Sequence, residues 1–306
     1  MNNALKNIRA RVNGYPSYLL REDIKSLFSQ RKTTSLGLIW YFFGAKKLHS
    51  IINNRYYDKS MGCYNIEGVK LPEEMFNYKG THFHIDLFDM LGKTCFDYYR
   101  KPNVDISRFG CEGPYELKNV KIEMGDIVID AGANMGVFSA LASKRCCTEN
   151  NEGAVYAFEP VSQNVELLEI TAALNSGITI IPEGLSDFTG EIEIFLQQGT
   201  GEHTMLSELS KNKDAEKINI QTTTLDDFAH KNNLHKIDFI KADIEGAERL
   251  MLKGAKNVLK DFAPKLAICT YHFPDDPQVL RELILDANPD YEIEDWHMKM
   301  FAYVPR

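Results

Sequence analysis

From Lys118 onward, short apolar segments alternate with stretches of helical periodicity, and this alternation limits the fold more than any other feature of the sequence. The pattern is typical of βαβ units and predicts a mostly parallel sheet. Its first segment, Asp126–Asp130, precedes a glycine-containing turn that ends at Gly136, and a helix runs on towards Cys147. The sequence therefore predicts an α/β fold, a Rossmann-like doubly wound sheet with helices on both faces.

The later elements continue the alternation. Further strands are predicted at Ala154–Phe158, Ile178–Leu185, Ile237–Ala242 and Lys265–Thr270. Helices are predicted from Ser162, from near Leu225, and from Glu245 or Gly246. Two more pairs of β-like segments are expected, Glu191–Leu196 with Ile218–Thr223 around a polar loop, and Tyr291–Trp296 with Met300–Val304 as a closing antiparallel pair.

Residues 1–110 lack this alternation and are predicted to form a mainly helical and irregular extension, rich in Tyr and Phe. Glu22–Gln30 and Leu36–Ile52 have helical character, and short strands are expected at Tyr64–Pro72 and His82–Leu87. We expect the extension to cover a cleft in the second domain, residues 111–306, and to shape its choice of substrate.

Charge is distributed unevenly along the chain. Residues 1–60 carry a net charge of +8 although the whole chain carries −8, so the remainder is strongly acidic. An acidic catalytic portion argues against a nucleic-acid partner, because phosphate binding needs a basic face. The basic start is interpreted as a solvated helical face, with weak peripheral contact to an anionic membrane as the alternative.

The cysteines and the apolar segments favour a cytoplasmic protein. The six cysteines form no C-x-x-C pair, and the adjacent Cys146 and Cys147 suit neither an ordinary disulfide nor a zinc site. We therefore expect reduced thiols. The longest apolar run, Leu36–Phe43, is far shorter than the ~20 residues of a membrane span, and no secretory signal is visible. Whether the chain forms a homo-oligomer is left open.

Polar residues at the strand ends are the candidate cofactor site, because ligands of such sheets bind beyond the carboxyl ends of the strands. After the first strand comes Asp130-x-Gly132-x-Asn134-x-Gly136. A dinucleotide fingerprint has a glycine where Asn134 stands, and Asp130 would repel a pyrophosphate. S-adenosylmethionine has no phosphate and carries an ammonium and a sulfonium, so an acidic residue beside the glycine turn suits it.

Two further strand ends support the same ligand. Glu159, followed by Pro160, ends the second strand, where an acidic side chain can accept both ribose hydroxyls. A helix N-terminal charge is the alternative for Glu159. Ser186 and Asp187 follow the third strand, where an adenine amino group is expected, and a plain turn is their alternative.

These blocks resemble the FkbM family of S-adenosylmethionine-dependent methyltransferases. The resemblance covers about residues 110–275, and its blocks are Gly125–Gly136, Ala157–Pro160, Gly184–Asp187, Thr224–Phe228 and Ile240–Glu248. It implies a class I methyltransferase fold, S-adenosylmethionine as cofactor, and O-methylation of a small molecule, often a sugar. The acceptor is not identified by the sequence.

Asp243, Glu245 and His272 are the candidate catalytic residues. Methyl transfer needs the acceptor positioned and its hydroxyl proton removed. Asp243 ends the fourth strand and is expected to contact cofactor and acceptor, whereas Glu245 contacts the acceptor or stabilises a helix start. His272 follows the fifth strand and is predicted to be the base, and His203, in a polar loop, is a weaker candidate. The first three residues have metal-ligand atoms, but a metal-free reaction is predicted.

Two other functions stay open on the residues alone. One is an NAD(P)-linked oxidoreductase, which Asn134 and Asp130 disfavour. The other is a binding module without activity, which the acidic residues at successive strand ends disfavour. A fold by itself does not decide between them.

Overall fold

The computed structural model describes residues 54–78, 114–147, 152–196, 216–296 and 298–305. The chain divides into two compact units, and most of the described residues belong to the second, which comprises residues 58–79 and 115–306. The predicted segments Glu22–Gln30, Leu36–Ile52 and His82–Leu87, as well as His203, lie outside the described residues.

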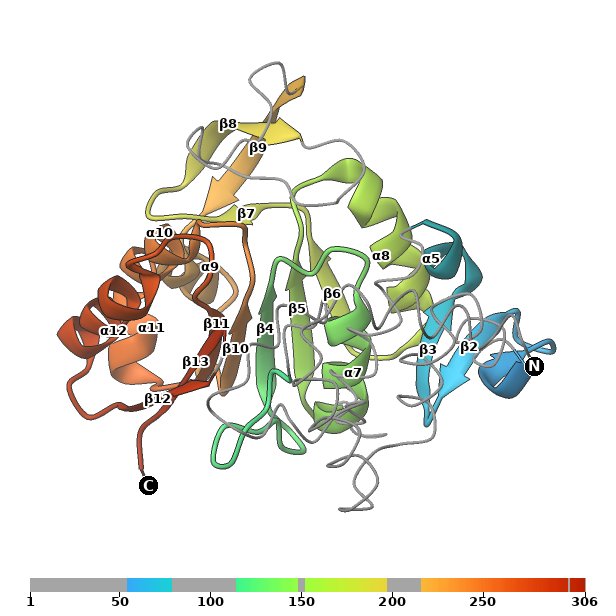
Figure 1. Ribbon diagram of the computed structural model, residues 1–306, viewed down its shortest axis with the longest axis horizontal. Helices are drawn as coiled ribbons and strands as arrows, with labels where there is room; N and C mark the ends of the chain where they lie inside the picture. The colour runs from blue at the N-terminus through green and yellow to red at the C-terminus, as the bar shows by residue number, and fades with distance from the viewer. Residues whose placement is uncertain (1–53, 79–113, 148–151, 197–215, 297, 306) are drawn as a thin grey trace, which may run out of the picture. The chain divides into compact units, whose positions relative to one another are not determined.

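A seven-stranded sheet organises the second unit (Figure 1). Its strand order is β12-β13-β11-β10-β4-β5-β6. The strands from β11 to β6 are parallel, and β13 runs antiparallel to both β11 and β12. The strands of this sheet are β4 (Ile127–Ala131), β5 (Ala154–Phe158), β6 (Ile178–Ile181), β10 (Phe239–Ala242), β11 (Lys265–Cys269), β12 (Glu292–Trp296) and β13 (Lys299–Tyr303). The predicted α/β class and Rossmann-like class I arrangement are confirmed.

Helices cover both faces of the sheet. The helices of this unit are α7 (Val137–Cys146), α8 (Ser162–Leu174), α9 (Leu225–Lys231), α10 (Glu248–Lys253), α11 (Lys256–Asp261) and α12 (Asp276–Ala287). In Figure 1, α7 and α8 lie to the right of the sheet and α9 to α12 to the left. None of the helices in the described segments is long and apolar enough to cross a membrane.

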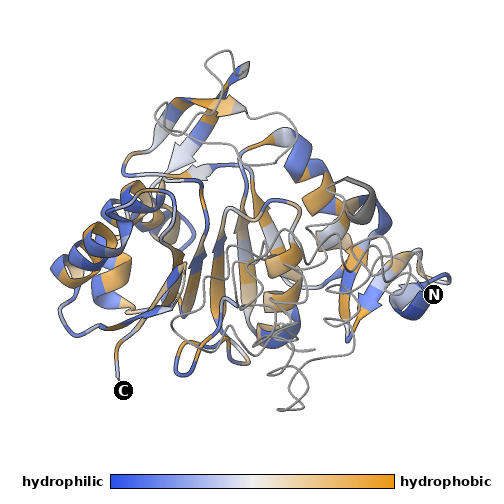
Figure 2. Ribbon diagram, viewed as in Figure 1, coloured by the Kyte–Doolittle hydropathy of each residue, from blue (hydrophilic) through white to orange (hydrophobic). Residues whose placement is uncertain are grey.

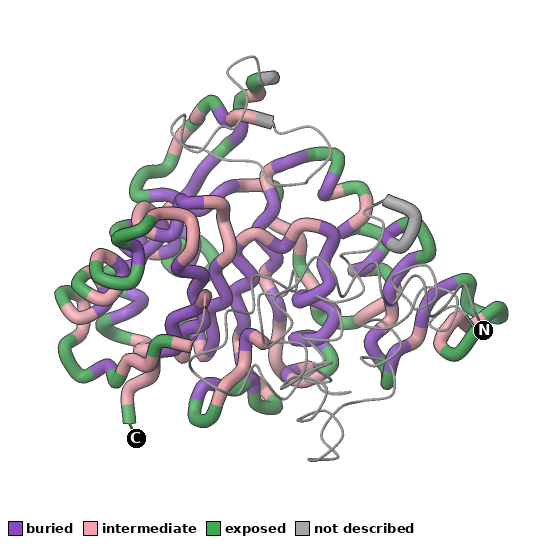
Figure 3. The backbone as a smooth tube through the Cα atoms, viewed as in Figure 1, coloured by how far each residue is buried: buried purple, intermediate pink, exposed green. Residues whose placement is uncertain are grey.

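The core lies between the sheet and these helices (Figures 2 and 3). On the face of α9 to α12, Ile129 and Ile240 pack with Met251, Leu280 and Ile284. The last two are four residues apart and so lie on one side of α12. On the opposite face, Ala133, Ala157 and Leu168 form a separate cluster that includes a buried residue of α8. The alternation of faces along each strand thus supplies apolar side chains to both layers.

Two small sheets accompany the large one. One contains β7 (Gly184–Leu185), β9 (Glu216–Thr223) and β8 (Gly190–Leu196) in that order. The two β-like segments predicted here are β8 and β9, and they pair antiparallel. The other contains β1 (Tyr57–Asp58), β2 (Cys63–Ile66) and β3 (Val69–Pro72), and a short helix, α5 (Glu73–Tyr78), follows. The side-chain amide of Asn175 holds this hairpin against the end of α8 by accepting from Lys70 N at 3.2 Å and donating to Lys70 O at 2.8 Å.

The structure corrects two sequence predictions and adds a helix that was not predicted. The third strand is not continuous over Ile178–Leu185, because it breaks at Pro182 and its last two residues pair with β9 instead. The helix expected from Glu245 or Gly246 begins only at Glu248, since those two residues have φ of 53° and 96° and cannot be helical. Finally, α12 had no counterpart in the prediction.

The described cysteines are Cys63, Cys146, Cys147 and Cys269, and all four are free thiols. Cys95 and Cys111 lie outside the described residues.

Candidate cofactor and acceptor site

The polar strand ends meet at one edge of the sheet. Ala131 pairs in register with Phe158 of β5 and with Ala242 of β10. The residues that follow, Gly132, Glu159 and Asp243, therefore lie at neighbouring positions on the carboxyl edge. Successive segments of the chain add strands on opposite sides of β4, so this is also the point where the strand order reverses and where such sheets bind ligands.

The turn after β4 depends on left-handed backbone. Gly132, Asn134 and Gly136 have φ of 76°, 52° and 87°. A Cβ on Gly132 would collide with the carbonyl oxygen of Asp243, so a side chain there would separate β4 from the residue that follows β10. The side-chain oxygen Oδ1 of Asn134 is buried and accepts no hydrogen bond from any residue that the structure describes. Within that part of the chain, the turn therefore offers an acceptor beside the strand ends.

Asp130 does not extend into this turn. Its side chain is fully buried, its Oδ2 accepts a hydrogen bond from Ser139 at 2.5 Å, and its Oδ1 lies 3.1 Å from Lys241 Nζ. Lys241 also donates to the carbonyl oxygens of Ala131 at 3.1 Å and Gly132 at 2.7 Å. Burial by itself would lower the pKa of Lys241, but Asp130 and Asp243 raise it above its usual value. A charged pair thus lies beneath the glycine turn and holds its backbone.

Glu159 directly follows β5 and is buried. Its Oε1 accepts from Val161 N at 3.0 Å and Asn164 Nδ2 at 3.2 Å, and its Oε2 accepts from Asn134 N at 2.8 Å. Burial raises the pKa of Glu159, although these three donors oppose the shift. A carboxylate has about four acceptor positions, so at least one remains on Oε2.

The remaining predicted cofactor residues, Pro160, Ser186 and Asp187, differ in burial and in the sheet that they follow. Pro160 is half-buried next to Glu159. Ser186 is fully buried, and its N donates to Thr223 O of β9, whereas Asp187 is exposed. Both follow β7, which pairs with β9 rather than with the large sheet.

Asp243 follows β10 and is surrounded by donors and cations. Tyr115 OH donates to its Oδ2 at 2.9 Å, and Tyr271 OH donates to its Oδ1 at 3.0 Å. Burial by itself would raise its pKa, but Lys241, His272 and Lys299 lower the pKa of Asp243 to about 2. Asp243 is therefore ionised at any physiological pH and is a weak base.

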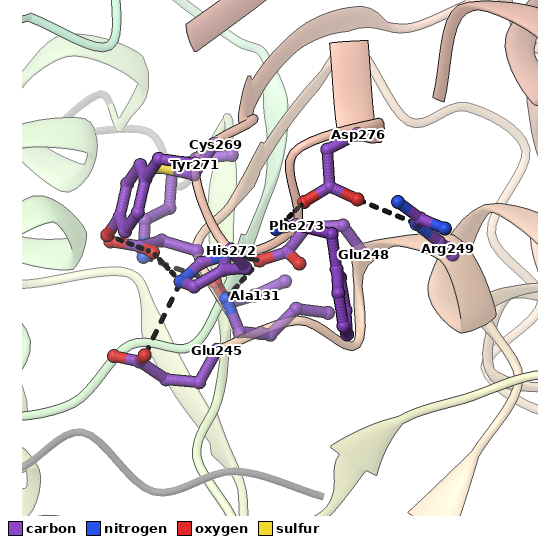
Figure 4. A network of polar contacts seen from close by, with 12 residues as sticks. Ala131, Glu245, Glu248, Arg249, Cys269, Tyr271, His272, Phe273 and Asp276 are labelled. Carbon is purple, nitrogen blue, oxygen red and sulfur yellow. Dashed lines mark hydrogen bonds and ion pairs between the residues drawn. The ribbon is translucent and has the colours of Figure 1, made fainter. Parts of the chain in front are cut away.

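His272 lies near Glu245 and Glu248 (Figure 4), and a third carboxylate, Asp243, is also close to its ring. Its Nδ1 is 3.2 Å from Glu248 Oε1, and its Nε2 is 3.4 Å from Glu245 Oε2 and 3.8 Å from Asp243 Oδ1. Burial alone would lower the pKa of this imidazole, but the carboxylates raise it to about 11. In this arrangement the ring keeps its proton at neutral pH, which does not favour the predicted role of His272 as a base.

The structure thus brings Asp243, Glu245 and His272 together as expected from adjacent strands. It adds residues that the sequence analysis did not select, namely Tyr115, Lys241, Glu248, Tyr271 and Lys299. Lys241 had a visible signal, because a lysine between Ile240 and Ala242 interrupts a buried strand. Tyr115 and Lys299 had none, since they lie far from the motif in sequence.

Comparison with known proteins gives a family match. The Methyltransferase FkbM domain family matches residues 130–301. The hexuronic acid methyltransferase AglP of Haloferax volcanii is 29% identical over 175 residues, 56% of this chain and 66% of that protein. The methyltransferase sdnD of Sordaria araneosa is 27% identical over 171 residues, 46% of this chain and 63% of that protein. The chain therefore spans slightly less than two thirds of the length of either relative.

Two solved structures show a distant similarity to the chain. A methyltransferase FkbM from Methylobacillus flagellatus is 22% identical, with a TM-score of 0.44, over 85% of this chain and 60% of that one. Fibrillarin from Aeropyrum pernix, in complex with S-adenosylmethionine, is 14% identical, with a TM-score of 0.37, over 61% of this chain and 70% of that one. Both TM-scores are below 0.5, and the family match above does not depend on them.

Proposed function

The chain belongs to the FkbM methyltransferase family, and we propose that it transfers a methyl group from S-adenosylmethionine to a hydroxyl of a small acceptor. The proposed acceptor class is a sugar or glycan precursor. One observation carries the proposal: the family match spans residues 130–301, which include the strand ends at Asp130, Glu159 and Asp243 that converge on one edge of the sheet.

The residues at this edge fit the cofactor. Asn134 Oδ1 is buried and has no hydrogen-bond partner in the described part of the chain, so it is suited to accept a hydrogen bond from the methionine ammonium. Glu159 keeps an acceptor position for the ribose hydroxyls. Asp187, Ser186 and Pro160 would surround the adenine, and Asp243 would face the methionine end. For Asp130 we propose a positioning role, because its carboxylate is already bound to Ser139 and Lys241.

When bound, S-adenosylmethionine supplies a methyl group activated by its sulfonium. The protein then has to orient the acceptor oxygen and take up its proton. Glu245 is the best proton acceptor of the cluster, since its side chain is 29% exposed, against 18% for Asp243 and 1% for Glu248. The protonated ring of His272 would donate a hydrogen bond and orient the acceptor. Asp243, ionised and held by two tyrosines, would fix the geometry.

The relatives suggest which acceptors to test. AglP is named for methylation of a hexuronic acid, so uronic-acid glycans and neutral sugars form the first panel. We expect one methyl group to be added, detected by mass, together with stoichiometric demethylated cofactor. A panel in which no acceptor gains a methyl group, while the chain binds and reduces or oxidises NAD(P), would show that the oxidoreductase alternative is correct.

Cofactor binding provides a second test with a matched control. Calorimetry should show that S-adenosylmethionine binds more tightly than NAD⁺. Glu159→Ala should lose about 1–3 kcal/mol of binding free energy, the cost of leaving hydrogen-bonding groups unpaired. Glu193→Ala removes a glutamate that pairs with Lys217 on the surface of β8, and it should bind as the wild type does. Equal binding by wild type and Glu159→Ala would contradict the ribose assignment.

A further inference from the structure

Three carboxylates converge on His272. Asp243, Glu245 and Glu248 each approach the imidazole to within 3.8 Å. Lys241 and Lys299 are close enough to Asp243 to lower its pKa. Buried charges are costly unless they are compensated. A divalent cation would compensate them.

The polar atoms of this cluster are incompletely paired. The side chains of His272 and Glu248 are only 5% and 1% exposed. Within the described residues, no hydrogen bond is formed by either ring nitrogen of His272 or by Oε2 of Glu248. The 3.2–3.8 Å approaches to the ring are ion-pair distances without hydrogen-bond alignment. Unpaired buried polar atoms in a native structure call for an explanation, and an unseen ion is one of the usual ones.

The spacing of the side chains suits a metal ion. Asp243, Glu248 and His272 each bring one potential ligand atom to within 4.8 Å of the others. Ligands placed about 2.1 Å from a common ion lie roughly 3.0–4.2 Å apart, from adjacent to opposite positions. The distances from His272 Nε2 to Glu245 Oε2, 3.4 Å, and to Asp243 Oδ1, 3.8 Å, fall in this range.

The two sides of the ring differ. Glu248 is fully buried beside Nδ1, and its Oε1 is fixed by a hydrogen bond from Ile244 N at 2.8 Å. Asp243 and Glu245, beside Nε2, are partly exposed. In metal sites, a ligating histidine commonly donates its other N–H to a carboxylate, which fixes the ring. Figure 4 shows Glu248 and Glu245 on different sides of His272.

We infer that this edge of the sheet is a divalent-cation site, with His272 Nε2, Asp243 Oδ1 and Glu245 Oε2 as ligands and Glu248 as the carboxylate that orients the imidazole. Oxygen and nitrogen ligands of this kind suit Mg²⁺ or Mn²⁺ as well as Zn²⁺. This assignment replaces the metal-free reaction predicted from the sequence, and with it the hydrogen bond from the protonated ring to the acceptor, because binding of a cation at Nε2 would release the proton there. It rests on the proposed function in one respect, because the cation would bind the acceptor hydroxyl.

The cation would change the role of the carboxylates. A hydroxyl bound to a divalent cation loses its proton more readily, so a weak base is enough to accept it. Glu245 would hold the cation through Oε2, and as the most exposed carboxylate of the cluster it would accept that proton. The site would therefore need no neutral histidine base.

Direct binding of Mn²⁺ tests the inference without acceptor or cofactor. The full-length chain, freed of metal with a chelator, is titrated with Mn²⁺ and followed by calorimetry and by the electron paramagnetic resonance signal of free Mn²⁺. We expect one ion per chain and a rise in melting temperature. His272→Asn and Asp243→Asn should abolish binding, and Glu248→Gln should weaken it on the order of 10–100-fold, as loss of an orienting carboxylate does.

The control is Asp295→Asn, which removes a carboxylate that pairs with Arg281 on the surface. It should bind Mn²⁺ as the wild type does. Glu245→Gln, changed at the most exposed ligand, is the second variant if His272→Asn does not fold, and it should weaken binding at least 10-fold. No Mn²⁺ binding by the wild type at millimolar concentration, or equal binding by the ligand variants and the control, would overturn the inference.

The outcome separates the two proposals. Methyl transfer that persists undiminished in excess chelator would overturn the cation site and leave the proposed function intact. Binding of Mn²⁺ that is lost in the ligand variants, in a chain that transfers no methyl group to any acceptor, would support the cation site and contradict the proposed function.

Discussion

Replacing Gly132 by alanine tests how the glycine turn joins the two halves of the sheet. Gly132 has φ of 76°, and an added Cβ would collide with the carbonyl oxygen of Asp243. Left-handed backbone costs a residue with a Cβ about 1–2 kcal/mol. Relieving the collision requires a backbone shift, for which overpacked sites lose about 1–3 kcal/mol more. We therefore expect Gly132→Ala to lower the free energy of unfolding by about 2–5 kcal/mol.

Gly125 provides the matched control. Its φ is 86°, but a Cβ there would have no atom within 4 Å. Gly125→Ala should therefore show only the backbone cost of about 1–2 kcal/mol. Urea unfolding of both variants, with calorimetry of S-adenosylmethionine binding, measures the difference. If Gly132→Ala is no less stable than Gly125→Ala and binds cofactor equally well, the close contact between the turn and Asp243 is unimportant and the reasoning fails.

Three further predictions concern other parts of the domain. Lys241→Met should lower the free energy of unfolding in urea by about 3–5 kcal/mol, because it leaves the buried carboxylate of Asp130 without its lysine. Adding Asp130→Leu to this variant should restore most of the loss, and a double variant that is no more stable would refute the pairing. Because the pKa of Glu159 is raised in the folded protein, this group contributes stability below about pH 4.5, and the contribution is lost as pH rises through the folded pKa. The affinity for S-adenosylmethionine should rise over the same pH window, because the ribose hydroxyls need the ionised carboxylate. Calorimetry at several pH values should find this dependence absent in Glu159→Gln, and its persistence there would assign it to another group. Asn175→Ala should destabilise the domain by about 1–3 kcal/mol and speed amide exchange at Lys70, whereas unchanged exchange would show that the hairpin is held elsewhere.

Much of the sheet could be predicted because its signals are local. β5 was predicted at its observed bounds, and β4, β10 and β11 within two residues, since apolar runs bounded by polar residues identify buried strands. The start of α8 at Ser162 was also predicted correctly. The prediction failed where pairing decided the outcome. No pattern within Ile178–Leu185 indicates that its last two residues pair with β9, because β9 lies more than thirty residues further along the chain.

The residues of the site show the same division. The sequence alone selected Asp130, Glu159, Asp243 and His272 as candidates, because each stands at or just beyond the end of an apolar strand and parallel strands end at one edge. Their roles depend on partners that local pattern does not encode. Asp130 is bound by Lys241, 111 positions away, and so lies beneath the turn rather than in it.

His272 illustrates the physical reason. From the sequence it is an imidazole near its ordinary pKa, and therefore a suitable base. The pairing of β10 with β11 places it beside Asp243, Glu245 and Glu248, and the field of three carboxylates decides its protonation and makes it a candidate metal ligand. Hydrophobic periodicity acts between neighbours along the chain and can be recognised in the sequence. Charge and burial at a site depend on distances in space, which only the assembled sheet determines.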